Sequence, residues 1–297
     1  MIRRVLLVLT AVLLLQPSGA PARAASRLKL RVLPALYTDS RERPLSEPEA
    51  VAFGASLLAV ADTGNGRIVT YSVSPEGIEP AGEFALPEIP YPVQIGVTSG
   101  GDLLVLDGRS RRIARVGRTG EFKGYLDLGR PAAVRAMALD RAGHLYVLDV
   151  GGPRILTFDP AGKPAGETSL PADAGFFSDL AVDTNGDTFL VDSVGRQLWV
   201  ARAGAADIVR LGPGLEGKVE FPTSLAVTRT GHILLVDQNG GGIAILGPTG
   251  VFEERQLAKG WREGFLRDPS DIATDGEDRV FVADRANNRV QVLVISQ

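Results

Sequence analysis

Residues 268–290 read DPSDIATDGEDRVFVADRANNRV, and this stretch contains a strand–turn–strand unit that ends in an aspartate. A short strand centred on Ala273 is followed by a turn rich in Asp and Gly, and a second strand ends at Asp284. The unit recurs at steps of 42–47 residues, with its final aspartate at Asp62, Asp107, Asp149, Asp192, Asp237 and Asp284. A period of this length predicts a repeat architecture.

Each repeat also provides two further strands. A polar loop after the aspartate leads into a third strand, as at residues 67–71, and a less regular fourth strand follows. Every repeat except the fifth, which has Gly242, carries an arginine at or next to the start of the third strand. Four short strands in each of six repeats predict an all-β, six-bladed β-propeller of four-stranded antiparallel blades. Strands that are apolar on both faces fit this fold, because each blade is packed between two others.

The two ends of the chain are expected to share one blade. The last repeat stops after its third strand, at residues 290–295, and the segment Leu28–Leu33 belongs to no repeat. We predict that this segment is the outer strand of the last blade, so that joining the ends closes the ring and removes an open sheet edge. Residues 25–45 are then the closing strand and its lead-in, and residues 46–297 form one propeller domain.

Residues 1–24 have the pattern of a secretory signal peptide. Two arginines at positions 3 and 4 precede an apolar run at 5–15, and a stretch of small residues ends in Ala22-Arg23-Ala24. The run is shorter than the roughly 20 residues of a membrane span, so we expect no stable span after cleavage; an N-terminal anchor is the alternative. The protein is expected to be exported, and either periplasmic or secreted.

The charge of the chain argues against nucleic-acid binding, and its cysteine count excludes disulfides. Removing residues 1–24 takes away three arginines, which leaves 29 basic residues against 35 acidic ones and a formal charge of −6. An acidic chain is a poor candidate for nucleic-acid binding, which depends on clustered Lys and Arg. The chain has no cysteine, so its stability rests on its core without disulfides.

The repeat resembles the NHL repeat. The pattern of Pro, apolar-Ala-apolar, Gly turn, Val-x-Asp, Asn/Gly loop and Arg-apolar is clearest at residues 268–290 and extends over residues 46–297. The resemblance implies a six-bladed propeller that serves mostly as a binding scaffold, although fold alone does not fix activity. Because the aspartate occurs in every repeat, we expect it to be structural and to accept hydrogen bonds from the following loop or pair with the nearby arginine. A ring of metal ligands is the alternative.

The same resemblance implies that the loops before the first strands open on one face, around the mouth of the channel. Polar groups that converge there from several blades would form the ligand site. Glu49, Asp179 and Asp271 would hold one Ca²⁺ if their oxygens converge; a solvated rim of mixed charge is the alternative. The complete set is Glu47, Glu49, Gln94, Arg135, Asp179, Ser224, Arg267 and Asp271.

A second candidate surface is the long lead-in at residues 259–265. It places Trp261 and Phe265 beside charged residues, a composition typical of partner-binding edges. The alternative is that Trp261 folds down onto its blade.

Two functions remain. The first is an exported, non-enzymatic binding scaffold without a cofactor, which recognises a protein, peptide or glycan through the loop face of the propeller. The second is a Ca²⁺-dependent hydrolase or lactonase similar to the six-bladed gluconolactonases, with Glu49, Asp179 and Asp271 as its metal ligands. The channel-facing Asn that such a site normally includes is missing.

Overall fold

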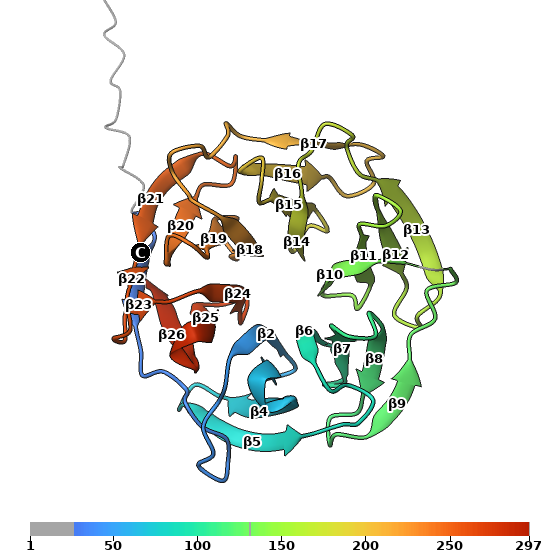
Figure 1. Cartoon of the computed structure of the whole chain (residues 1–297). Coiled ribbons are helices and arrows are strands. Elements are labelled where there is room, and N and C mark those ends of the chain that lie inside the picture. The colour runs from blue at the N-terminus through green and yellow to red at the C-terminus, as the bar shows by residue number, and fades with distance from the viewer. Residues whose placement is uncertain (1–26, 131, 297) are drawn as a thin grey trace, which may run out of the picture.

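The computed structural model describes residues 27–130 and 132–296, so the predicted signal peptide lies outside the described residues. In this part of the chain, six four-stranded antiparallel sheets surround a central axis as the blades of a propeller (Figure 1). The predicted fold class is therefore confirmed. Among the described residues, no helix has the length and apolar character to cross a membrane.

In blades 1 to 5 the strands run outwards from the axis in chain order. Blades 1 to 3 contain β2 (Pro48–Gly54), β3 (Leu57–Asp62), β4 (Arg67–Val73) and β5 (Ile78–Phe84); β6 (Pro92–Val97), β7 (Leu103–Asp107), β8 (Ile113–Val116) and β9 (Phe122–Tyr125); and β10 (Val134–Leu139), β11 (Leu145–Asp149), β12 (Arg154–Phe158) and β13 (Pro164–Ser169). Blades 4 and 5 contain β14 (Phe177–Val182), β15 (Thr188–Asp192), β16 (Gln197–Ala201) and β17 (Ile208–Leu211); and β18 (Pro222–Val227), β19 (Ile233–Asp237), β20 (Gly242–Leu246) and β21 (Phe252–Gln256).

Blade 6 joins the two ends of the chain. It contains β24 (Pro269–Thr274), β25 (Arg279–Asp284), β26 (Arg289–Ser296) and, as its outer strand, β1 (Lys29–Val32). β1 pairs antiparallel with β26 in the register Lys29 to Ser296, and a further bridge joins Leu36 to Val290. The predicted closing strand is thus confirmed, and it covers an edge that would otherwise be open to another chain.

The hydrophobic core lies between blades. Six clusters of buried residues occupy the six interfaces between neighbouring blades of the described chain. Leu28, just before β1, is 1% exposed and belongs to the cluster between blades 5 and 6. Because each inner strand packs on both sides, its sequence is apolar at successive positions, as in residues 233–236.

The repeated aspartates connect loops at one end of each blade. Each carboxylate accepts a hydrogen bond, with an N–O distance of 2.7–3.0 Å, from a backbone N–H in the lead-in to the first strand of its own blade. The six donors are Ser46, Tyr91, Ala133, Phe176, Phe221 and Arg267. Short 3-10 turns, η1 (Thr63–Asn65) and η2 (Arg285–Asn287), follow the aspartate in blades 1 and 6.

In several blades an arginine also pairs with the repeated aspartate; we call the aspartate with its lead-in hydrogen bond and this ion pair the loop anchor. Arg67, Arg154 and Arg289 lie 2.6–2.8 Å from the aspartates of blades 1, 3 and 6. In blade 5, where Gly242 replaces this arginine, Arg255 of β21 lies 2.9 Å from Asp237 instead. The ion pair is therefore kept in blade 5, although its cation comes from the outer strand.

Candidate functional site

The channel of the propeller contains two cavities. The first, of about 420 Å³, is lined by the first strands of all six blades and by hairpin turns that follow these strands; we call it the turn-face cavity. The second, of about 280 Å³, lies at the other end, beside loops that follow the repeated aspartates; we call it the loop-face cavity. Gln94, Asp179 and Asp271 line both cavities, so they form the waist of the channel.

The waist forms where the first strand of each blade carries a β-bulge. The bulge leaves one residue unpaired with the second strand, and the next residue resumes the register. That next residue is long and polar in blades 2, 4 and 6 and small in blades 1, 3 and 5. In blade order the six residues are Ala50, Gln94, Ala136, Asp179, Ser224 and Asp271.

Each long side chain at the waist ties its blade to the next one. Gln94 Oε1 accepts a hydrogen bond from the backbone N–H of Met137 at 2.6 Å. Asp179 Oδ2 and Asp271 Oδ2 accept equivalent bonds from the next blades, at 3.2 and 2.9 Å. The small residues in the alternate blades leave room for this reach, so the waist has a pseudo-threefold pattern within a sixfold ring.

Ser224 connects the two aspartates. Its Oγ lies 2.8 Å from Asp179 Oδ2 and 2.6 Å from Asp271 Oδ1. A serine hydroxyl has one hydrogen to donate, so it satisfies only one of these oxygens as a donor. The other short contact requires a hydrogen on the carboxyl group, with the serine oxygen accepting. The geometry therefore favours one proton shared by Asp179 and Asp271, which we call the carboxyl pair.

Burial favours the same protonation state. Burial raises the pKa of Asp179 above its ordinary value, and the nearby charge of Asp271 raises it further. Burial also raises the pKa of Asp271, and the charge of Glu49 acts in the same direction. Hydrogen bonds from Ser224 and from backbone N–H groups oppose both shifts. Asp179 is 6% exposed, so its charged form loses most of its hydration.

The loop-face cavity contains charged side chains with an ion-pair partner and others without one. Glu49 Oε1 lies 2.9 Å from Arg285 Nη1, and Arg285 also contacts Asp268. Arg111 and Arg135 line the same cavity, and neither forms an ion pair within the described residues. Arg111 donates to the carbonyl of Val134 at 3.4 Å. Arg135 also lies over the ring of Phe176, with its Cζ 5.3 Å from the ring centroid, and Asp179 and Asp271 line the same cavity.

The predicted Ca²⁺ ligands do not form a cluster. In the described ranges, no group of three or more His, Cys, Asp or Glu side chains is arranged to hold a metal ion. Glu49 pairs with Arg285, whereas Asp179 and Asp271 are bonded to Ser224 and to backbone N–H groups. Two other predicted rim residues, Glu47 and Arg267, do not line either cavity.

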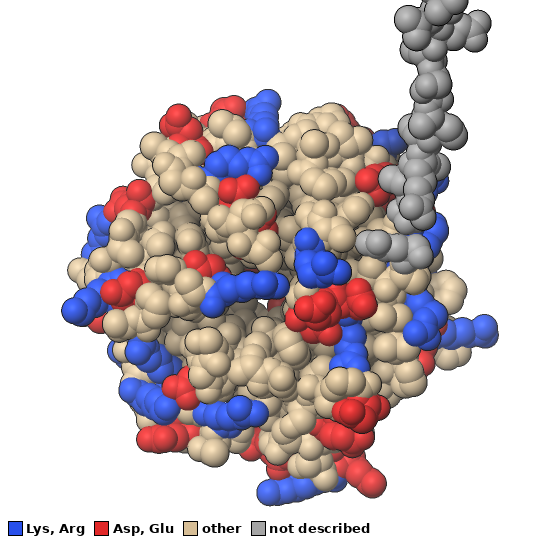
Figure 2. All heavy atoms as spheres, turned by 180° about the vertical axis from the view of Figure 1, so that it is seen from behind, with Lys and Arg blue, Asp and Glu red and all other residues tan. Residues whose placement is uncertain are grey.

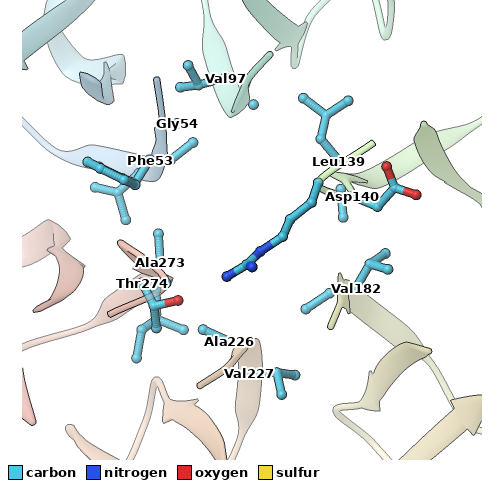
Figure 3. A pocket seen from close by; sticks show the side chains of 18 of the residues that line it. Phe53, Gly54, Val97, Leu139, Asp140, Val182, Ala226, Val227, Ala273 and Thr274 are labelled. Carbon is cyan, nitrogen blue, oxygen red and sulfur yellow. The ribbon is translucent and has the colours of Figure 1, made fainter. Parts of the chain in front are cut away.

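The turn-face cavity is lined by both apolar and polar groups. One residue from each blade lies around it, and Figure 3 shows these residues surrounding a common opening: Phe53, Val97, Leu139, Val182, Val227 and Thr274. Arg141 and Arg229 lie at its mouth, where Arg229 is 3.7 Å from Glu277. A Cβ on Gly276 of blade 6 would lie 3.4 Å from Arg141 Nη2 of blade 3, so this guanidinium extends across the mouth.

The second candidate surface lies apart from the channel. Trp261 and Phe265 line neither cavity; their loop lies between β22 (Ala258–Lys259) and β23 (Phe265–Leu266), a parallel pair at the outer rim (Figure 1). Trp261 is 71% exposed and Phe265 is 41% exposed. The buried Arg289 donates to the carbonyls of Trp261, Arg262 and Phe265 at 2.7–3.2 Å, which fixes the backbone beneath the exposed rings.

Sequence reasoning grouped Gln94, Asp179, Ser224 and Asp271, and the structure brings these four together. It missed Arg111 and Arg141. Arg111 follows the repeated Asp107 within its loop, and Arg141 follows the turn residue Asp140. Aligning the repeats by their aspartates would have placed one arginine at each end of the channel.

The surface around the channel is of mixed charge. Figure 2, which shows the back of Figure 1, has basic and acidic side chains interspersed around a central opening. No broad basic surface of the kind that binds nucleic acid is seen on this face.

Comparisons with known proteins agree with the fold. The family model of the NHL repeat matches residues 266–293. A streptogramin B lyase is similar over 91% of this chain and 98% of its own, at 14% identity and a TM-score of 0.61. A virginiamycin B lyase from Staphylococcus aureus covers 90% of this chain and 99% of its own, at 14% identity and a TM-score of 0.60.

A protein described as an auxiliary nutrient binding protein from Bacteroides ovatus is similar over 91% of this chain and 74% of its own, at 14% identity and a TM-score of 0.66. A search of curated proteins gave no match. Likeness at this identity establishes the fold and leaves activity open. The chain is a six-bladed β-propeller in which the NHL repeat is recognised at residues 266–293.

Proposed function

We propose that this protein is an exported, non-enzymatic binding protein that recognises a protein, peptide or glycan through the loop face of its propeller. The observation that carries the proposal is the pair of arginines in the loop-face cavity, Arg111 and Arg135, neither of which has an ion-pair partner among the described residues. A guanidinium offers several donors in a fixed plane and suits carboxylate groups. The group recognised in this cavity is therefore anionic, such as an acidic side chain, a peptide carboxylate or an acidic sugar.

The polar groups of the waist favour binding over catalysis. The oxygens of Asp179 and Asp271 accept hydrogen bonds from Ser224 and from neighbouring blades, which fixes them as links between blades. Both histidines of the chain are bonded within their own hairpins, His144 to Asp140 and His232 to Thr230, each at 2.9 Å. A Ca²⁺-dependent hydrolase would need Glu49 beside the carboxyl pair, but Glu49 is paired with Arg285.

The solved relatives are compatible with this proposal. Propellers of this shape include both lyases and a protein described as nutrient-binding. The fold therefore permits a binding role, and the choice between binding and catalysis depends on the side chains of this chain.

The test uses residues 25–297, immobilised and panned against a random peptide phage library and an array of acidic and neutral glycans. We expect ligands with an acidic group, and we expect Arg111→Ala and Arg135→Ala to weaken their binding by about tenfold or more, since hydrogen bonds to charged groups contribute about 1.5–3 kcal/mol. Arg229→Ala, an arginine on the opposite face, is the matched control. Ligands that bind both loop-face variants as tightly as the wild type would refute the proposed site.

A parallel assay addresses the hydrolase alternative. Turnover of a panel of lactones and p-nitrophenyl esters is measured with Ca²⁺ and with a chelator. Ca²⁺-dependent turnover that Asp179→Asn abolishes would overturn the non-enzymatic proposal.

A further inference from the structure

We propose that the loop-face cavity binds a single acidic sugar residue, whose carboxylate lies at Arg111 and Arg135 and whose hydroxyl groups face the opposite blades. This choice of ligand depends on the loop-face function proposed above and makes its ligand class specific. Three features of the cavity carry it: arginines on one side, hydroxyl and amide groups on the other, and an exposed aromatic ring.

The residues left unpaired by the six β-bulges all line the loop-face cavity, and they divide it into two sides. In blades 1 to 3 these residues are Glu49, Val93 and Arg135. In blades 4 to 6 each one carries a hydroxyl group: Ser178, Thr223 and Ser270. The amide side chain of Gln238, from the loop after the aspartate of blade 5, lines the cavity as well. One half of the wall is therefore polar without charge.

The polar side matches the chemistry of a sugar. Hydroxyl and amide groups both donate and accept hydrogen bonds, as the hydroxyls of a sugar do. Ser270 Oγ donates to the carbonyl of Pro48 at 3.2 Å, and Ser178 Oγ lies 2.6 Å from Ser193 Oγ. The Oγ1 atom of Thr223 has no hydrogen-bond partner among the described residues. A buried hydroxyl without a partner costs free energy, so a ligand that supplies one is favoured.

On the charged side, Arg111 occupies a position that favours glycine. It is the fourth residue after the repeated aspartate, and this position has a left-handed backbone in five blades, with φ of 47–65° at Gly66, Arg111, Arg196, Gly241 and Asn288. Gly and Asn adopt this conformation more easily than other residues. Blade 2 therefore keeps a guanidinium there at a conformational cost. Its bond to the carbonyl of Val134, at 3.4 Å, leaves further N–H donors for a ligand.

The charges around Arg135 place the carboxylate of the ligand between the two arginines. Although part of its side chain is exposed, burial lowers the pKa of Arg135, and the like charge of Arg111 lowers it further. The charges of Asp179 and Glu49 act in the opposite direction. These two acids already have partners, at the waist and in Arg285. A carboxylate between the guanidiniums offsets their repulsion and accepts charge-assisted hydrogen bonds from both.

Tyr91 provides the aromatic ring. It lines the cavity and is 38% exposed. The backbone N–H of Gly108 donates to the carbonyl of Tyr91 at 2.8 Å, and a Cβ on Gly108 would lie 2.9 Å from Tyr91 Cδ1, so the ring packs directly on this glycine. The Cζ of Arg109 lies 5.8 Å from the ring centroid and adds a further cation at this edge. A fixed, exposed ring offers apolar surface to the C–H groups of a sugar.

The size of the cavity favours a sugar over a peptide. Its volume of about 280 Å³ lies just below the range of typical small-molecule sites, so it has room for one ring-sized unit. An acidic side chain of a peptide would use the arginines and leave the hydroxyl side without partners. A sugar acid uses both sides at once, and the rest of a glycan chain would extend out of the loop face.

Ligand-observed NMR titrations of residues 25–297 test this ligand class. The probes are the methyl glycosides of glucuronic, galacturonic and mannuronic acid. Three sets of controls each lack one feature: the corresponding neutral methyl glycosides lack the carboxylate, cyclohexanecarboxylate lacks the hydroxyls, and a glutamate dipeptide lacks the sugar ring. We expect at least one uronoside to bind about tenfold or more tightly than every control, as hydrogen bonds to charged groups imply.

Two variants test the two sides of the cavity. Arg111→Gly should fold, because glycine favours the left-handed backbone, and should weaken uronoside binding by about tenfold or more. Arg196→Gly is the matched control: Arg196 has the same left-handed position and donates to the carbonyl of Glu220, but it lines neither cavity. Thr223→Val removes a hydroxyl without a partner, so it should leave thermal unfolding unchanged and weaken uronoside binding by about threefold or more, with no effect on cyclohexanecarboxylate.

The outcomes separate this ligand class from the loop-face function itself. If cyclohexanecarboxylate or the dipeptide binds as tightly as the uronosides, and Arg111→Gly weakens it, the sugar is wrong and the anionic loop-face site stands. If neutral glycosides bind as tightly as uronosides, both proposals are wrong about the arginines. If no uronoside binds, the acidic sugar is excluded, and the panning with Arg111→Ala and Arg135→Ala still decides the loop-face function.

Discussion

Replacing Leu28 with alanine tests whether the N-terminal strand holds the ring closed. Leu28 is 1% exposed and packs in the cluster between blades 5 and 6, with Leu266 and Leu293 among its members. A buried Leu→Ala change costs about 2–5 kcal/mol through lost burial and the cavity that remains. For a domain of this size each kcal/mol lowers Tm by about 2–4 °C, so we expect Tm to fall by about 4–20 °C.

The assay is thermal unfolding followed by circular dichroism and calorimetry on residues 25–297. Arg31→Ala is the matched control, because Arg31 is an exposed residue of the same strand and its loss should cost less than about 0.5 kcal/mol. Deletion of residues 25–36 should have a larger effect than Leu28→Ala, since it also removes the pairing of β1 with β26 and the bridge from Leu36 to Val290. If Leu28→Ala melts within about 2 °C of the wild type, the closing strand does not stabilise the ring as argued.

Two further changes test the loop anchors and the waist. Asp237→Ala leaves the N–H groups of Glu220 and Phe221 and the guanidinium of Arg255 without their acceptor. In urea unfolding, the free energy of unfolding should therefore fall by about 3 kcal/mol or more. Asp207→Ala, at an exposed position, is the control and should change it little; equal losses for the two variants would contradict a structural role. The native carboxyl pair holds a proton in a pH range where the unfolded chain has lost it, because burial raises both pKa values. The unfolding free energy should therefore fall as pH rises through that range. Urea titrations from pH 4.5 to 8 should show a shallower fall for Asp179→Asn than for the wild type. Identical pH profiles for the two proteins would argue against the shared proton.

Much of the fold follows from the sequence because the repeat is strict. The spacing of the aspartates gives the blade count, and the missing fourth strand of the last repeat gives the closure by residues 28–33. The arginine that pairs with Asp237 could not be predicted, because Arg255 comes from the outer strand and only the folded blade brings it near. The repeated sequence pattern predicts contacts between residues at fixed positions in each repeat. It does not predict a contact such as that of Arg255 with Asp237, which forms only when the outer strand is paired in the sheet.

The candidate site was predicted only in part, for a reason that lies in the β-bulge. From their positions at the first strands, the sequence predicted that Glu49 and Arg135 lie around the channel mouth in the same way as Gln94 and Asp179. The bulge separates them, because Glu49 and Arg135 are the unpaired residues, whereas Gln94 and Asp179 resume the pairing one position later. A shift of one residue along a strand turns a side chain to the other face. Glu49 therefore pairs with Arg285 in the loop-face cavity and forms no hydrogen bond with the carboxyl pair.

The repeats themselves separate structural from functional positions. A residue that every blade needs in order to fold should be the same in every blade, and the repeated aspartates meet that condition with the same lead-in hydrogen bond in all six. A residue that serves a ligand on the axis is under no such constraint, because one ligand cannot contact six blades in the same way. The waist meets this second condition, with Gln94, Asp179 and Asp271 alternating with Ala50, Ala136 and Ser224. The departure from sixfold symmetry at the waist has a structural basis, because Gln94, Asp179 and Asp271 each accept a backbone N–H bond from the next blade across a small residue.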